Sequence, residues 1–145
     1  MTGQRFDVAI VGASIAGCTA ARFFALAGAR VALIDRNPDP DAYKVVCTHA
    51  IQSSATPTLE RLGLAPLLEA RGAVRTGARF WTPFSGWVEL PDDLPRAWGI
   101  TRRALDPMLR ALAADTPGVE MMLGHTATAL LGDNGRPSGV ALTRR

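Results

Sequence analysis

The sequence lacks the features that mark several classes of protein. It contains only two cysteines, Cys18 and Cys47, and their spacing does not match a metal-binding motif, so we expect reduced thiols and no metal site. No apolar run approaches the ~20 residues that cross a bilayer. The first apolar run leads into a glycine turn and not into a signal-peptide cleavage site. The sequence therefore predicts a cytoplasmic protein without a membrane partner.

Concentrated charge is also missing. The 16 basic residues only slightly outnumber the 13 acidic ones, for a net charge of +3, and they are scattered along the chain. This distribution predicts no nucleic-acid partner, although a mildly positive site would suit an anionic ligand. What is present is 145 residues, 48% hydrophobic and 20% charged, which is typical of one soluble globular domain with a sizeable core.

The most informative stretch covers residues 6–24. Residues 8–11 form a short apolar run that predicts a buried strand, and the alanine-rich residues 16–26 predict a helix. Between them, three small residues occupy the glycine positions of the dinucleotide fingerprint G-x-G-x-x-G. A tight turn from strand to helix leaves N–H groups without partners where the helix dipole favours negative charge. We therefore expect a pyrophosphate to bind at Gly12, Ala13, Ser14, Ile15, Ala16 and Gly17.

Ser14 departs from the fingerprint, in which a middle glycine lets the phosphates approach the backbone. Its Cβ crowds that approach, while its hydroxyl offers a hydrogen bond in return. The surrounding sequence supports the fingerprint. Gly28 predicts the end of the helix, and residues 29–34 predict a second strand. This strand ends in Asp35, 23 positions after Gly12, about where a carboxylate for a ribose hydroxyl is expected.

Two other interpretations use the same residues. A turn of small residues can simply pack a helix on a strand. Residues 12–16 also approach the G-x-S-x-G nucleophile elbow of hydrolases, with Ser14 as the nucleophile. That elbow lies on a sheet built by earlier strands, whereas only a few residues precede Val8, and no Asp and His pair is singled out for a triad. The dinucleotide interpretation is therefore favoured.

The rest of the chain predicts a long excursion followed by a return to the sheet. The predicted elements, in order, are a turn at 36–44, an irregular connector at 45–54, a broken helix at 57–70, a hairpin of 78–82 with 86–90, a helix at 104–114, a strand at 119–123 and a hairpin of 125–131 with 138–143. The tryptophans at 81, 87 and 98 either line a pocket or belong to a sheet core. The fold class is α/β, a nucleotide-binding unit with an antiparallel insertion.

This arrangement resembles the flavoprotein monooxygenases of the aromatic-hydroxylase class, with their relatives the flavin-dependent halogenases and geranylgeranyl-reductase-like enzymes. The resemblance covers nearly all of the chain. Residues 7–17 look like the segment of these enzymes that binds the FAD pyrophosphate. The resemblance implies that Asp35 holds the adenosine ribose and that Arg36 lies over the adenine side. It also implies that Lys44 lies near the phosphate or the ring, and that Arg102, with Arg103 as the alternate, touches FAD.

The resemblance also implies a Rossmann-like FAD-binding domain with a β-meander, which is incomplete at residue 145. The Asp-Gly and Gly-Asp segments that such enzymes carry further along are not in this sequence. Residues 1–145 would be the N-terminal portion of that domain, with residues 72–99 as a hairpin excursion toward the substrate side. We then expect an unpaired sheet edge, little turnover by the isolated chain, and association with the missing C-terminal part or as a homo-oligomer.

The implied cofactors are FAD and NAD(P)H as reductant, with O2 forming a flavin hydroperoxide that hydroxylates a small aromatic or apolar substrate. A reductase of a double bond and a halogenase are the alternatives within the family. Halogenases need a relay lysine, and Lys44, the only lysine, suits a flavin contact better. Outside the family, a nicotinamide-binding unit would return to the sheet sooner, and a non-catalytic dinucleotide-binding fragment is the other alternative.

No catalytic residue is singled out by the sequence. His49 lies in the segment that the resemblance places beside the flavin, and its imidazole could transfer a proton. A loop histidine bonded to the backbone is the commoner case, and His125 at a strand start is expected to be structural. Cys47 could approach the flavin, although a small buried hydrophobe is the default for cysteine.

Overall fold

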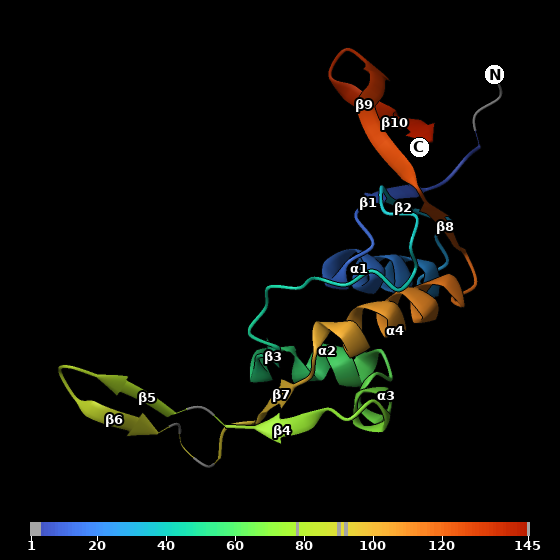
Figure 1. The fold of residues 1–145 in the computed structure, drawn as a ribbon. Coiled ribbons are helices and arrows are strands. Elements are labelled where there is room, and N and C mark those ends of the chain that lie inside the picture. The colour runs from blue at the N-terminus through green and yellow to red at the C-terminus, as the bar shows by residue number, and fades with distance from the viewer. Residues whose placement is uncertain (1–3, 78, 90, 92, 145) are drawn as a thin grey trace. The chain divides into compact units, whose positions relative to one another are not determined.

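The computed structural model describes residues 4–77, 79–89, 91 and 93–144. The chain divides into two compact units (Figure 1). The first unit comprises Met1–Tyr43 and Asp106–Arg145, and the second comprises Lys44–Leu105. Helix α4, Arg102–Ala114, crosses the boundary between them in the sequence.

The first unit is built on a parallel sheet of three strands in the order β1-β2-β8. These strands are β1 Val8–Val11, β2 Val31–Asp35 and β8 Val119–Leu123. Val31 of β2 aligns with Val8 on one side and with Val119 on the other. The first four residues of β2 are buried, as expected for a continuous apolar run in a parallel sheet. The three predicted strands of the nucleotide sheet are thus confirmed.

β1 lies at one edge of this sheet. Within the residues that the structure describes, it pairs only with β2, and the side chain of Val11 is 61% exposed. This confirms the expected unpaired edge. An apolar edge strand of this kind is a template on which another strand can pair. The expected association, with a C-terminal part or with a second copy, stays a prediction.

Helix α1, Ile15–Leu26, connects β1 to β2 and begins one residue before the predicted helix. Its buried side chains, Cys18, Ala21 and Ala25, are all small. Gly28 ends the helix with a φ of +92°, a conformation that glycine adopts without strain. The N–H of the next residue then donates to the carbonyl of Phe24, which is the hydrogen bond of a Schellman motif. The predicted glycine stop is confirmed.

The first unit ends in a long hairpin formed by β9, His125–Asp133, and β10, Arg136–Arg144. Asn134 and Gly135 connect the two strands with φ angles of +51° and +76°. A two-residue turn with both φ angles positive matches the twist of antiparallel strands, which is why Asn-Gly is favoured there. The hairpin predicted from the Asn-Gly pair is confirmed.

The second unit contains a small antiparallel sheet in the order β3-β7-β4. Its strands are β3 Ala50–Ile51, β4 Val74–Thr76 and β7 Ala97–Gly99. The expectation of an irregular connector over residues 45–54 is therefore wrong where β3 forms, and β4 and β7 were not expected at all. Strands of two or three residues carry almost no periodicity, so their pairing depends on tertiary contacts around the fully buried Trp98.

The predicted broken helix of the second unit is confirmed. It consists of α2, Thr56–Arg61, and α3, Ala65–Ala70, and the short 3-10 turn η1, Ser53–Ala55, precedes it. Gly63 lies between α2 and α3 with a φ of +68°. None of the helices in the described ranges combines the length and the apolar character needed to cross a membrane.

The other hairpin of the second unit pairs β5, Arg79–Thr82, with β6, Gly86–Glu89. It confirms the prediction, although residues 78 and 90 at the predicted ends lie outside the described residues. Trp81 faces Trp87 across this hairpin, and their side chains are 61% and 65% exposed. Of the three tryptophans, only Trp98 therefore belongs to a core.

Candidate functional site

The fingerprint residues lie where β1 ends and α1 begins, within the first unit. Gly12 turns the chain with a φ of +107° while its N–H donates to the carbonyl of Ile34 at 2.7 Å. Glycine adopts this φ at no steric cost. Gly17 has a different reason to be glycine: a Cβ there would lie 1.8 Å from the carbonyl oxygen of Gly12. The first glycine therefore shapes the turn, and the last lets the helix pack against it.

Ser14, at the middle fingerprint position, is the N-cap of α1. Its backbone is extended, with φ −100° and ψ −169°, and its hydroxyl makes no capping hydrogen bond to the helix. This conformation is open to any residue, so serine fits there without strain. Its side chain is exposed. The departure from the fingerprint therefore costs the fold nothing.

The first turn of α1 offers backbone donors. In the described part of the chain, the amides of Ile15, Ala16 and Gly17 have no protein acceptor, as expected for the first residues of a helix. The first turn carries no acidic side chain of its own, and the positive end of the helix dipole lies there. This combination suits an anion with several oxygen atoms, such as a phosphate.

Asp35 ends β2 with its carboxylate against the glycine turn. Its Oδ2 accepts a hydrogen bond from the N–H of Ala13 at 2.6 Å, and its Oδ1 accepts one from the N–H of Asn37 at 2.8 Å. The structure thus brings together the two predicted halves of the site, which are 22 residues apart in the sequence. Each carboxylate oxygen has further lone pairs that can accept from a ligand hydroxyl. The amides of Gly12 and Ala13, by contrast, are used within the protein.

The loop after Asp35 carries the predicted Arg36, whose side chain is exposed. A second arginine binds the far part of this loop. The buried Arg110 of α4 donates through Nη1 to the carbonyl of Pro40 at 3.1 Å and to the carbonyl of Ala42. Arg110 is not among the residues that the sequence singles out. An arginine on an amphipathic helix normally points to solvent, so the sequence carries no signal that this one is buried.

Lys44 and Arg102, the remaining predicted cofactor residues, belong to the second unit. Lys44 is exposed, whereas Arg102 is only 7% exposed. The N–H of Arg102 lies 3.4 Å from Nδ1 of His49, and its Nη1 lies 4.0 Å from Sγ of Cys47. Arg102 is thus the centre of a small cluster at the start of α4.

Both histidines are bonded to the backbone. Nδ1 of His49 accepts from the N–H of Arg102, and the carbonyl of His49 accepts from the N–H of Ile100 at 2.9 Å. Nδ1 of His125 lies 2.8 Å from the carbonyl oxygen of Leu123. The contact of His49 confirms its interpretation as a loop histidine bonded to the backbone, and that of His125 agrees with the expected structural role. His49 nevertheless has a φ of +59°, which is uncommon for a residue other than glycine and stores strain in this loop.

The two cysteines differ in acidity. Burial raises the pKa of the Cys18 thiol to about 11. The backbone N–H of His49, aided by the guanidinium of Arg102 and the charge of Lys44, lowers the pKa of the Cys47 thiol below its ordinary value. Cys47 is only partly buried, so reagents can reach it. Its default interpretation as a buried hydrophobe is therefore wrong.

We expect iodoacetamide to alkylate Cys47 at least about tenfold faster than Cys18 at pH 8, because the thiolate is the nucleophile and a lowered pKa increases its fraction. Mass spectrometry of tryptic peptides over time measures both rates. The Cys47→Ser variant should be labelled slowly. Equal labelling of both cysteines in the folded protein would contradict the assignment.

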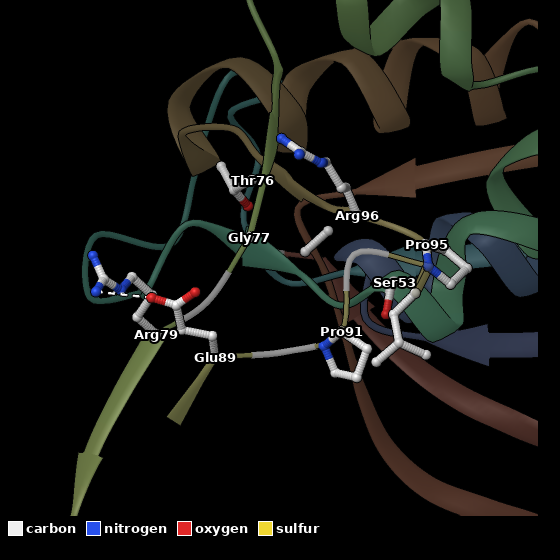
Figure 2. A pocket seen from close by; sticks show the side chains of 10 residues that line it. Ser53, Thr76, Gly77, Arg79, Glu89, Pro91, Pro95 and Arg96 are labelled. Carbon is white, nitrogen blue, oxygen red and sulfur yellow. Dashed lines mark ion pairs between the residues drawn. The ribbon is translucent and has the colours of Figure 1, made fainter. Parts of the chain in front are cut away.

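A cavity of about 340 Å³ lies elsewhere in the second unit (Figure 2). Figure 2 shows Arg79 and Glu89 facing each other at its side, joined by an ion pair of 2.8 Å. Both side chains are about two-thirds exposed, so this pair contributes little stability. None of the predicted site residues lines the cavity.

Comparison with known proteins identifies the family. A family model described as an FAD binding domain matches residues 5–145. The chain is 34% identical over 143 residues to a menaquinone reductase of Mycolicibacterium smegmatis, an alignment that covers 95% of this chain and 34% of the relative. It is 29% identical over 137 residues to digeranylgeranylglycerophospholipid reductase 2 of Methanothermobacter thermautotrophicus, covering 94% of this chain and 34% of the relative.

Solved structures give the same fold. The myxobacterial chondrochloren halogenase CndH superposes with a TM-score of 0.79 and 26% identity, over 96% of this chain and 33% of the halogenase. The chain thus spans about a third of the length of the curated relatives that it matches. The match takes in the glycine turn, Asp35 and α4 together. The chain belongs to the FAD-binding domain family of flavin-dependent oxidoreductases.

Proposed function

We propose that this chain forms the part of a flavin-dependent reductase that binds the ADP half of FAD, and that the enzyme delivers electrons to an apolar substrate. The observation that carries the proposal is the hydrogen bond from Ala13 to the carboxylate of Asp35. It fixes the acid beside the first turn of α1, whose amides lack acceptors among the residues that the structure describes.

The residues present fit the diphosphate and ribose of FAD. The amides of Ile15, Ala16 and Gly17 would bind the diphosphate, assisted by the dipole of α1. The hydroxyl of Ser14 can donate to a phosphate oxygen. The carboxylate of Asp35 keeps acceptor capacity for ribose hydroxyls beyond the two backbone amides that it already binds. Arg36, which follows directly, would lie on the adenine side.

The second unit would supply further groups that contact FAD. The family resemblance assigns Lys44 and Arg102 to that role. The contacts of Arg102 with Cys47 and His49 support it, because they gather a cation, a thiol of lowered pKa and an imidazole in one cluster. When bound, FAD supplies the electron and hydride transfer. The residues of this chain bind and orient it, and NAD(P)H remains the proposed reductant.

The type of reaction is inferred from the relatives. Menaquinone reductase and digeranylgeranylglycerophospholipid reductase 2 are 34% and 29% identical to this chain, whereas the superposed halogenase is 26% identical. OxyS anhydrotetracycline hydroxylase from Streptomyces rimosus is likewise 26% identical. The higher identities of the two reductases favour a reductase over the hydroxylase that the resemblance alone puts first. The names of these two reductases suggest a quinone or a prenyl double bond as the acceptor here. Hydroxylation is the second candidate, favoured by solved neighbours such as the OxyS hydroxylase, which superposes with a TM-score of 0.74.

A visible spectrum tests the proposal directly. Purified protein mixed with FAD and passed through a desalting column should keep the two-band absorption of bound flavin. NAD in place of FAD should not be retained. Once the flavin is photoreduced without oxygen, its reoxidation by a short-chain menaquinone or a prenyl alkene would support the reductase. Oxygen-dependent hydroxylation of an aromatic compound would support the monooxygenase instead. Failure to retain any flavin would overturn both.

A further inference from the structure

Arg110 is a buried charge that the proposed FAD site leaves unexplained. Its side chain is 7% exposed on α4, and its Nη1 donates to the carbonyls of Pro40 and Ala42. Burying a guanidinium costs free energy unless its N–H groups are hydrogen-bonded. Here the acceptors are backbone carbonyls of one loop. That loop begins directly after Asp35.

The loop depends on these bonds because it has few others. Pro38 and Pro40 carry no N–H to donate. Among the described residues, the backbone hydrogen bonds of the loop are from Ala42 to Asp39 and from Gly124 to Asn37, both 3.3 Å long. The Gly124 bond holds the start of the loop. Arg110 therefore supplies the anchor of its second half.

Side-chain hydrogen bonds connect this anchor to Asp35. The carboxylate of Asp39 accepts from the N–H of Asp41 at 2.9 Å, and the amide oxygen of Asn37 accepts from the N–H of Asp39 at 3.0 Å. The carboxylate of Asp35 in turn accepts from the N–H of Asn37. Three successive bonds thus fix the backbone from position 35 to position 41. The two carbonyls that Arg110 holds lie at the far end of this series.

The charge of Arg110 also acts on the helix of the glycine turn. Burial raises the pKa of Cys18 on α1, and the positive charge of Arg110 opposes that increase. Its charge therefore acts on α1 while its N–H groups bind the loop. One side chain of α4 thus contacts the second half of the loop and contributes positive charge near the helix whose first turn would bind the diphosphate.

We infer that Arg110 is a positioning residue for the adenosine half of the cofactor: it fixes the carbonyls of Pro40 and Ala42 and, through the loop, holds the carboxylate of Asp35 against the ribose. Arg110 itself does not touch the cofactor. The inference rests on the proposed function, since it assigns the ribose to Asp35.

Three variants test it: Arg110→Met, which keeps the volume and removes the donors, Arg110→Lys, which keeps one charged donor group, and Asp35→Asn. Calorimetric titration with ADP and with FAD should show about tenfold weaker binding of both ligands by Arg110→Met. The loss of a hydrogen bond from a charged group typically lowers an affinity by about this factor or more. Arg110→Lys should recover most of the affinity. In the double variant that combines Arg110→Met with Asp35→Asn, the two losses should be less than additive, because both act on the same carboxylate.

A second measurement needs no cofactor. Trypsin can cleave after Arg36, at the start of the loop. The ligand-free Arg110→Met variant should be cut there faster than the unmodified protein, and Arg110→Lys should be protected again. If Arg110→Met fails to fold, the same comparisons between Arg110→Lys and the unmodified protein decide the matter, with a smaller expected change.

The outcomes separate the inference from the proposed function. If the unmodified protein binds neither ADP nor FAD, the proposed function fails and the inference fails with it. If it binds both, and Asp35→Asn weakens binding while Arg110→Met does not, the inference is wrong and the proposed function stands. Fully additive losses in the double variant would also overturn the inference, because they would mean that Arg110 acts only on general stability.

Discussion

Replacing Gly17 by alanine is expected to abolish FAD binding and to lower the unfolding temperature by about 10 °C or more. The added Cβ would lie 1.8 Å from the carbonyl oxygen of Gly12 and 3.0 Å from its carbonyl carbon. Both are backbone atoms of the turn, so no side chain can move aside to make room. The loss should exceed the ~1–3 kcal/mol typical of an extra methylene in a packed core. Thermal unfolding and a flavin titration measure the two effects.

Gly77→Ala is the matched control for this experiment. A Cβ at Gly77 would meet no atom within 4 Å, and its φ is not in the left-handed region. Both variants reduce the freedom of the unfolded chain equally, so this control isolates the steric effect. Gly77→Ala should bind FAD normally and unfold at the usual temperature or slightly above it. A Gly17→Ala protein that still bound FAD with unchanged affinity would show that the helix does not pack on the turn as described.

The second large effect is expected at Asp35. Asp35→Asn keeps the size of the side chain but replaces one carboxylate oxygen by an NH2 group, which cannot accept from the N–H of Ala13 or Asn37. The backbone N–H that loses its acceptor then faces the NH2 group of the new side chain, which is also a donor. The ribose hydroxyls lose a charged acceptor. We expect about hundredfold weaker binding of FAD, measured by fluorescence titration.

Asp39→Asn separates the ribose contact from the effect on the loop. Asp39 accepts from the N–H two residues on, as Asp35 does, but it makes no bond to the glycine turn. Asp39 accepts a single N–H in this series, and the amide oxygen of asparagine can accept it instead, so the substitution removes a charge but keeps the bond. It should change FAD affinity by less than about threefold. Equal losses from the two substitutions would mean that the charge of the loop, and not the position of Asp35, governs binding.

The parts of the fold that the sequence predicts correctly are those fixed by local physics. The strand, glycine turn and helix over residues 8–26 follow from β-branched residues, a left-handed Gly12 and an alanine-rich run. The Asn-Gly turn of the last hairpin follows from two positive φ angles in sequence. β3, β4 and β7 do not follow in this way, because each is too short to show a period and exists only through pairing with a partner distant in the chain.

The candidate site likewise has features that the sequence predicts and features that depend on tertiary packing. By itself, the sequence determined that Gly12, Ser14, Gly17 and Asp35 are spaced as a dinucleotide-binding unit requires, since spacing is a property of the chain. The tertiary structure alone decided that the carboxylate of Asp35 accepts the amide of Ala13, and that Arg110 is buried against the loop between positions 40 and 42. The physical reason is that hydrogen bonds between distant residues form only when strands and helices pack, and a one-dimensional pattern does not record which polar groups that packing brings within about 3 Å.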